Sequence, residues 1–157
     1  MKKILLLIFV INIPNHCQII KEKSLIGIWQ ANTKIISSGY QDTYQFFSNG
    51  DFIFHTNQND GLQRVVEIKG SYNLIKDTIY LEIKSTLEKI GGKIVRSDIT
   101  TLSDSWEIID CHIKEIKQPS DDIQNIILEP CKVKDETCLI FDKSILYYKI
   151  NNNPSKY

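Results

Sequence analysis

The side chains that most often do acid-base, nucleophilic or metal chemistry are few in this chain. Its three histidines are His16, His55 and His112, and neither of the last two lies in a recognisable nucleophile or metal-binding motif. Cys111 stands next to His112, and neighbours on a strand point to opposite faces, which disfavours a shared zinc site. We therefore expect no enzymatic activity, no bound metal and no cofactor.

Arg64 is the charged residue that breaks the pattern of its segment. Within 62–72 alternate residues are apolar, and Arg64 falls in their phase. An inward-facing guanidinium needs an anionic partner. We expect Arg64 to bind the carboxylate or phosphate of a ligand whose apolar part contacts Phe46, Phe52 and Phe54. The alternative is that Arg64 reaches solvent or pairs with a protein carboxylate.

Two of the cysteines are placed to form a disulfide. Cys131 and Cys138 flank a short polar loop between two predicted strands, and an oxidising compartment would preserve a bond between them. Cys111 would then remain a free thiol, buried on the same face as Ile109 and Ile113. Sequence does not fix connectivity, so pairing of Cys111 with either of the other two is the alternative.

The elements that would position these side chains are β-strands. Apolar and polar residues alternate with a period of two, in segments separated by polar turns about every ten residues. Asn49-Gly50 offers the positive φ angles of a tight hairpin. The expected strands are 28–36, 44–47, 52–55, 62–72, 78–84, 86–90, 93–100, 106–116, 123–128, 139–141 and 145–150.

This pattern predicts an all-β protein. Consecutive antiparallel strands with short connections favour a single up-and-down β-barrel of about eight to ten strands, because closure removes exposed sheet edges. A two-sheet sandwich is the alternative. Gly91-Gly92 lacks the surroundings of a phosphate-binding loop, and we interpret it as a kink that divides two strands.

The tripeptide Gly27-Ile28-Trp29 at the head of the first strand, together with the strand pattern, resembles the lipocalin-like barrels of the calycin type, of the exported bacterial kind. In that family the tryptophan closes one end of the barrel, and a basic residue from the last strand covers it. The resemblance implies that Trp29, next to Gly27, takes the closing position and that Lys149 covers it, where the family usually has arginine. The family's Thr-Asp-Tyr-type motif is missing from this sequence.

The start of the chain predicts export. Two lysines precede the apolar run Ile4–Ile13, which Pro14 ends, as in a secretory signal peptide covering residues 1–18. The run is too short to span a bilayer, which needs about 20 residues, so no transmembrane segment is expected in the mature chain. We expect a periplasmic or extracellular protein, with lipid attachment at Cys17 as an alternative outcome of processing.

The remaining chain is long enough for one domain with a hydrophobic core, residues 19–150, followed by a disordered tail, residues 151–157. Nineteen basic residues balance nineteen acidic ones, so no overall field favours nucleic acid or an anionic membrane. The sequence does not indicate an oligomeric state.

These observations lead to two functional expectations. The first is an exported protein that holds a small apolar or amphipathic molecule in its barrel. The alternative is a cell-envelope interaction module with a filled barrel and no ligand. Cavity volume discriminates between them, because ligand sites usually have about 300 Å³ or more, whereas small barrels can be filled by side chains.

Overall fold

The computed structural model of the chain describes residues 20–35, 41–57, 59–97, 105–119, 122–131, 133 and 137–156. The predicted signal peptide, residues 1–18, and Cys17 lie outside the described residues. The elements are α1 (Glu22–Leu25), β1 (Gly27–Ala31), β2 (Thr43–Phe46), β3 (Asp51–His55), β4 (Val65–Ile75), β5 (Thr78–Arg96), β6 (Trp106–Lys117), β7 (Ile123–Pro130), β8 (Cys138–Phe141) and β9 (Ile145–Asn151). In these ranges no helix has the length and hydropathy needed to cross a membrane.

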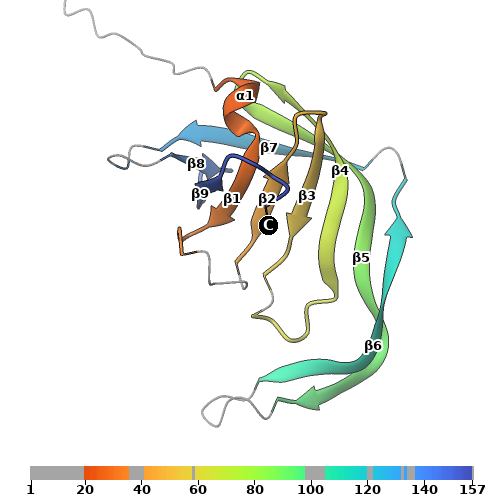
Figure 1. Cartoon of the computed structure of the whole chain (residues 1–157). Coiled ribbons are helices and arrows are strands. Elements are labelled where there is room, and N and C mark those ends of the chain that lie inside the picture. The colour runs from red at the N-terminus through yellow and green to blue at the C-terminus, as the bar shows by residue number, and fades with distance from the viewer. Residues whose placement is uncertain are drawn as a thin grey trace, which may run out of the picture.

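Eight of the strands close into one antiparallel up-and-down barrel (Figure 1). The order around the barrel is β1, β2, β3, β4, β5, β7, β8 and β9, and pairing of β9 with β1 completes the ring. β6 is the additional strand, and within the described ranges it pairs with β5 alone. The predicted fold class is confirmed, and the architecture is compatible with a lipocalin-like fold.

The β2–β3 hairpin shows how turn chemistry and alternation build the wall. Gly50 has a φ of 85°, and the Asn49 side-chain oxygen accepts a hydrogen bond from the Asp51 amide at 3.1 Å. In β3, Phe52 is buried in the barrel core, whereas its neighbour Ile53 lies on the opposite, partly exposed face. The hairpin predicted at Asn49-Gly50 is confirmed.

β5 is one continuous strand of 19 residues, where the sequence suggested three. Its first part lies between β4 and β7, and its last part pairs with β6 and projects away from the barrel (Figure 1). Gly91 and Gly92 have φ angles of 71° and 84°, and Asp110, opposite in β6, has a φ of 55°. These left-handed residues bend the two-stranded ribbon without ending it, so the predicted division at Gly91-Gly92 is wrong.

The first strand is shorter than its alternation suggested. β1 ends at Ala31, because Asn32 takes a left-handed backbone with a φ of 61°, whereas the alternating pattern predicted a strand over 28–36. At the other end of the chain, β9 includes Asn151. Beyond it, the amide of Asn153 donates to the Asn151 side chain and the amide of Ser155 to the Asn153 side chain.

The core fills the inside of the barrel. It contains buried side chains from all eight barrel strands together with Leu25 of α1. The fully buried members with the largest volume are Trp29, Phe46 and Phe52. Burial of such side chains is the main source of stability in a domain of this size.

Candidate functional site

Trp29, which is 1% exposed, lies where α1 meets the first strand of the barrel. Its indole Nε1 donates a hydrogen bond to the Leu25 carbonyl at 2.6 Å, which ties β1 to α1. The Lys149 ammonium lies 5.5 Å from the centre of the Trp29 ring and donates to the Ser24 carbonyl at 2.8 Å. Burial lowers the pKa of Lys149. The two residues that the family resemblance pairs therefore lie together, with the lysine over the ring.

Gly27 makes this arrangement possible. A Cβ atom at this position would contact the backbone of Asn151 and would come within 2.7 Å of the Lys149 side chain. Gly27 also has a φ of 135°, a conformation that other residues rarely adopt. The absence of a side chain at Gly27 thus lets the Lys149 stem cross the first strand on its way to Trp29.

An aromatic cluster occupies the barrel interior. Tyr44 lies at its centre, with its ring 4.4 Å from that of Phe54, 5.4 Å from Phe46, and 5.5 Å from both Phe141 and Tyr147. Phe141 and Tyr147 are themselves 4.3 Å apart. Such tilted and stacked pairs add to the stability gained from burial alone.

Among the described residues, one small cavity lies beside this cluster. Its volume is about 50 Å³, and it is lined by Tyr44, Phe52, Phe54, Ile68, Leu81, Ile83 and Gln124. Two of the three phenylalanines proposed to contact a ligand, Phe46 and Phe52, are almost fully buried in the core. A cavity of this size holds about one or two water molecules and is far below the volume of a usual ligand site.

A second hollow lies beside Phe54, the third of those phenylalanines. Its volume is about 280 Å³, and it is lined by Asp42, Phe54, Thr56, Asn57, Asp60 and Gln63. The Asp42 carboxylate already accepts a hydrogen bond from the Asn57 amide at 2.7 Å. This lining is mostly polar, so it does not match the apolar ligand that the sequence suggested.

Arg64 lies outside the barrel interior. Its side chain is exposed, and its Nη1 donates to the carbonyl oxygens of Lys89 at 2.9 Å and Gly91 at 3.1 Å. The predicted inward orientation of Arg64 is wrong, because β4 begins only at Val65 and the alternation of the strand does not extend to Arg64. The guanidinium fastens the segment before β4 to the edge of β5.

A charged network on the outer wall was not anticipated. His55 Nδ1 lies 3.3 Å from one oxygen of Glu67, and Lys69 Nζ lies 2.7 Å from the other. Burial lowers the pKa of His55, and the nearby Glu67 opposes that shift. His55 and Glu67 are cross-strand partners, so only the register of β3 against β4 reveals the contact. Across the described ranges, no three His, Cys, Asp or Glu side chains cluster so as to hold a metal ion.

The disulfide between Cys131 and Cys138 is present and links the end of β7 to the start of β8, as predicted. Cys111 is a free thiol. It is only partly buried, and its neighbours in phase, Ile109 and Ile113, are exposed. The prediction of a buried Cys111 is therefore wrong, because this part of β6 lies on the projecting ribbon and not in the barrel wall.

The projecting ribbon, Lys89–Arg96 of β5 with Trp106–Ile113 of β6, is named the arm below. Its exposed apolar side chains are Ile94 (58%), Trp106 (50%), Ile109 (39%) and Ile113 (54%).

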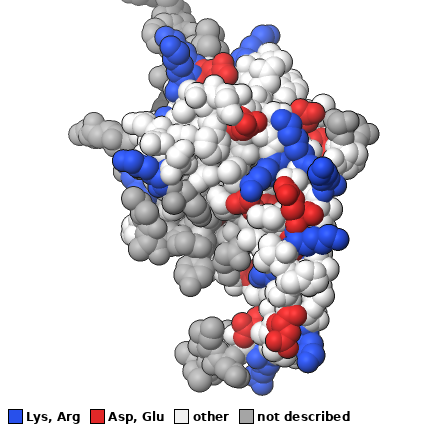
Figure 2. Space-filling model, turned by 45° about the vertical axis from the view of Figure 1, so that its right-hand side comes forward, with Lys and Arg blue, Asp and Glu red and all other residues white. Residues whose placement is uncertain are grey.

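Two backbone hydrogen bonds hold the arm to the segment before β4. The Ile108 amide donates to the Gly61 carbonyl at 3.1 Å, and the Lys89 amide to the Arg64 carbonyl at 2.8 Å. Figure 2 brings the side formed by β4, β5 and β6 forward and shows acidic and basic side chains interspersed along it. The arm thus presents separate apolar side chains among charges of both signs.

The buried tyrosines predict a loss of stability at high pH. Burial raises the pKa of both Tyr44 and Tyr147, whereas in the unfolded chain tyrosine ionises near pH 10. Stability from these groups is therefore complete below about pH 10 and falls as the pH rises above it. Tyrosinate absorbance should increase together with loss of near-UV circular dichroism. The variant Tyr44→Phe/Tyr147→Phe should lose less stability over this range, and an equal loss would contradict the prediction.

Comparison of the chain with protein-family models, with curated proteins and with solved structures gave no significant match.

Proposed function

We propose that this protein is an exported interaction module, in which the filled barrel is a rigid scaffold and the arm recognises a protein partner. The observation that supports this proposal best is the exposure of Ile94, Trp106 and Ile113 on a ribbon that projects from the barrel. A partner that covers this ribbon would remove the apolar surface of these side chains from water, which favours binding. Tryptophan in particular is enriched among residues that dominate binding energy.

The energetics of the arm favour the same interpretation. An isolated two-stranded ribbon is at best marginally stable in water, so the arm by itself contributes little to the stability of the fold. The chain nevertheless fastens it through Arg64 to Lys89 and Gly91 and through the Gly61 carbonyl to Ile108. A fastened ribbon loses less conformational freedom when a partner binds, which favours affinity.

The arm also carries charges that disfavour strand pairing between the arms of two copies of the chain. Lys89, Lys93 and Arg96 lie along the arm, and charged side chains on edge strands discourage indiscriminate strand addition. Lys93 is 3.8 Å from Asp110 across the two strands, an exposed pair that contributes little to stability. These charges favour a specific partner over general self-association.

The other function expected from the sequence was binding of an apolar ligand inside the barrel. The cavity of about 50 Å³ beside the aromatic cluster gives that proposal no support. Export remains part of the present proposal, because the Cys131–Cys138 disulfide is compatible with an oxidising compartment.

Site-specific photo-crosslinking in the native host tests the role of the arm. A photoreactive phenylalanine analogue at position 106 should give one defined adduct. The same analogue at Tyr80, which is 37% exposed on the barrel part of β5, is the matched control and should not give that adduct.

Once the adduct is identified, its binding to the purified protein can be measured. Ile94→Ser and Ile113→Ser should each weaken binding by about tenfold, as expected for loss of a buried apolar contact, while Tyr80→Ser should not. Equal crosslinking from positions 106 and 80, or binding that is insensitive to both isoleucine variants, would contradict the proposal.

A further inference from the structure

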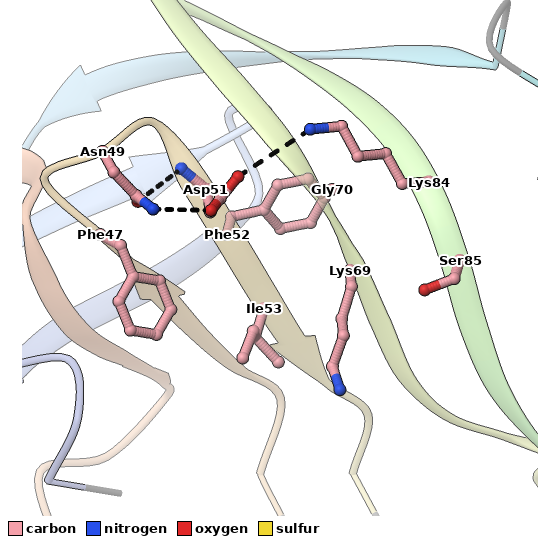
Figure 3. Close-up of a pocket in the computed structure, with 9 residues that line it drawn as sticks. All are labelled: Phe47, Asn49, Asp51, Phe52, Ile53, Lys69, Gly70, Lys84 and Ser85. Carbon is pink, nitrogen blue, oxygen red and sulfur yellow. Dashed lines mark hydrogen bonds and ion pairs between the residues drawn. The ribbon is translucent and has the colours of Figure 1, made fainter.

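A groove on the outer wall of the barrel, away from the aromatic interior, has the dimensions of a ligand site. It runs over β3, β4 and β5, beside the β2–β3 turn (Figure 3), and its volume is about 440 Å³. Its lining residues are Phe47, Asn49, Asp51, Phe52, Ile53, Lys69, Gly70, Lys84 and Ser85. This volume lies within the usual range for small-molecule sites, about 300 to 1,000 Å³.

A strand irregularity beside Gly70 shapes the groove. A Cβ atom at Gly70 would collide with the Glu82 carbonyl and would lie 2.8 Å from the Phe52 ring. The register between β4 and β5 shifts at the same place, since Lys69 pairs with Ser85 but Gly70 pairs with Ile83. The missing side chain at Gly70 makes room for the Phe52 ring, which is 1% exposed and packs into the barrel core, and Gly70 itself lines the groove beside the register shift.

The same irregularity places a cation at the groove. Lys84 is the extra residue of β5 between the pairs formed by Ser85 and Ile83, and bulged residues commonly redirect a side chain. In Figure 3 the Lys84 side chain extends toward Asp51 and the β2–β3 turn. A positive charge thus lies at one side of a groove whose other walls include Phe47 and Ile53.

The ion pair that Lys84 forms with Asp51 is long and exposed to solvent. The Lys84 Nζ is 3.9 Å from Asp51, and both side chains are about half exposed, at 56% and 53%. Asp51 has a closer partner, because the Asn49 amide group donates to its carboxylate at 2.7 Å. Lys69 is likewise engaged with Glu67 at 2.7 Å. A surface pair as long as that of Lys84 contributes little, so an incoming anion can replace it at small cost.

We propose that this groove binds a small amphipathic carboxylate. The apolar part would lie against Phe47 and Ile53, and the carboxylate would accept a hydrogen bond from Lys84. A charge-assisted contact of this kind would set the head-group preference, and the apolar walls would provide most of the affinity. This site is separate from the arm, so the proposal does not depend on the proposed function.

Dodecanoate is a suitable probe, with dodecyltrimethylammonium as the matched amphiphile of opposite charge. Titration of the isotope-labelled protein should move the amide resonances of Phe47, Ile53 and Lys84 and leave those of the arm unchanged. Dodecanoate should bind about fivefold more tightly than the cation, as expected for one partly exposed charge contact. Movement of amide resonances only in the barrel interior or only in the arm would overturn the proposal. Tighter binding of dodecyltrimethylammonium than of dodecanoate would also overturn it.

Variants of Lys84 and Ile53 separate the contribution of charge to binding from that of the apolar wall of the groove. Lys84→Gln should remove the preference for dodecanoate over the cation, and Lys84→Arg should retain it. Ile53→Glu, a partly exposed position, should abolish binding of dodecanoate while the circular dichroism of the fold is unchanged. Unaltered binding in both Lys84→Gln and Ile53→Glu would overturn the assignment. Movement of the same resonances with protein concentration alone would identify a second copy of the chain as the occupant and would also overturn it.

Discussion

Replacing Trp29 with alanine is expected to lower the free energy of unfolding by about 3 to 5 kcal/mol. The side chain is 1% exposed and belongs to the core cluster, so its removal leaves a large cavity in the barrel core. The change also removes the donor to the Leu25 carbonyl and the ring beneath Lys149. Equilibrium denaturation in urea measures the effect. Since domains are typically stable by about 5 to 15 kcal/mol, the variant should be close to unfolding at moderate temperature.

The second tryptophan of the chain provides a matched control. Trp106 is 50% exposed on the arm, so Trp106→Ala should change the free energy of unfolding by less than about 1 kcal/mol. The same residue type is thus tested in the barrel and on the arm. A loss below about 1 kcal/mol for Trp29→Ala would mean that this side chain does not support the barrel core. The resemblance to lipocalin-like proteins would then lose the residue on which it mainly rests.

The parts of the fold that depend on local chemistry were accessible from the sequence. Asn49-Gly50 predicted the hairpin because only a few residues adopt positive φ angles without strain. Phe52 was expected to face the barrel interior, and it is buried there, because alternate side chains of a strand point to the same face. Both inferences need only neighbouring residues, and the structure agrees with both.

The errors arose where a residue's neighbours come from distant parts of the chain. Cys111 was assigned to a buried face from its phase with Ile109 and Ile113, but phase does not reveal whether anything covers that face. Arg64 was placed inside because the strand was assumed to begin earlier than Val65. Gly91-Gly92 predicted a division between two strands, although glycine permits a bend as well as a break.

The candidate site residues were predictable only in part. Whether the barrel is hollow depends on how the rings of Tyr44, Phe141 and Tyr147 pack against one another, and their composition alone does not determine this. The outer groove depends on a one-residue register shift beside Gly70, which pairing across strands creates. A glycine within an alternating strand is the one local signal that could have pointed to it.

Removal of the disulfide is expected to have the second largest effect on stability. The bond joins Cys131 and Cys138, which are seven residues apart, and the chain-entropy model assigns roughly 2 to 3 kcal/mol to closure of so short a loop. Cys138 is buried at the start of β8, so Cys131→Ala/Cys138→Ala keeps the position apolar and isolates the effect of the cross-link. Urea denaturation of the variant should give this loss, and reduction of the wild type should give a similar one.

Cys111→Ala, which alters the free thiol on the arm, should change the unfolding free energy little. If the double variant matches the wild type, or if Cys111→Ala is the more damaging change, the linkage between β7 and β8 does not stabilise the fold as argued.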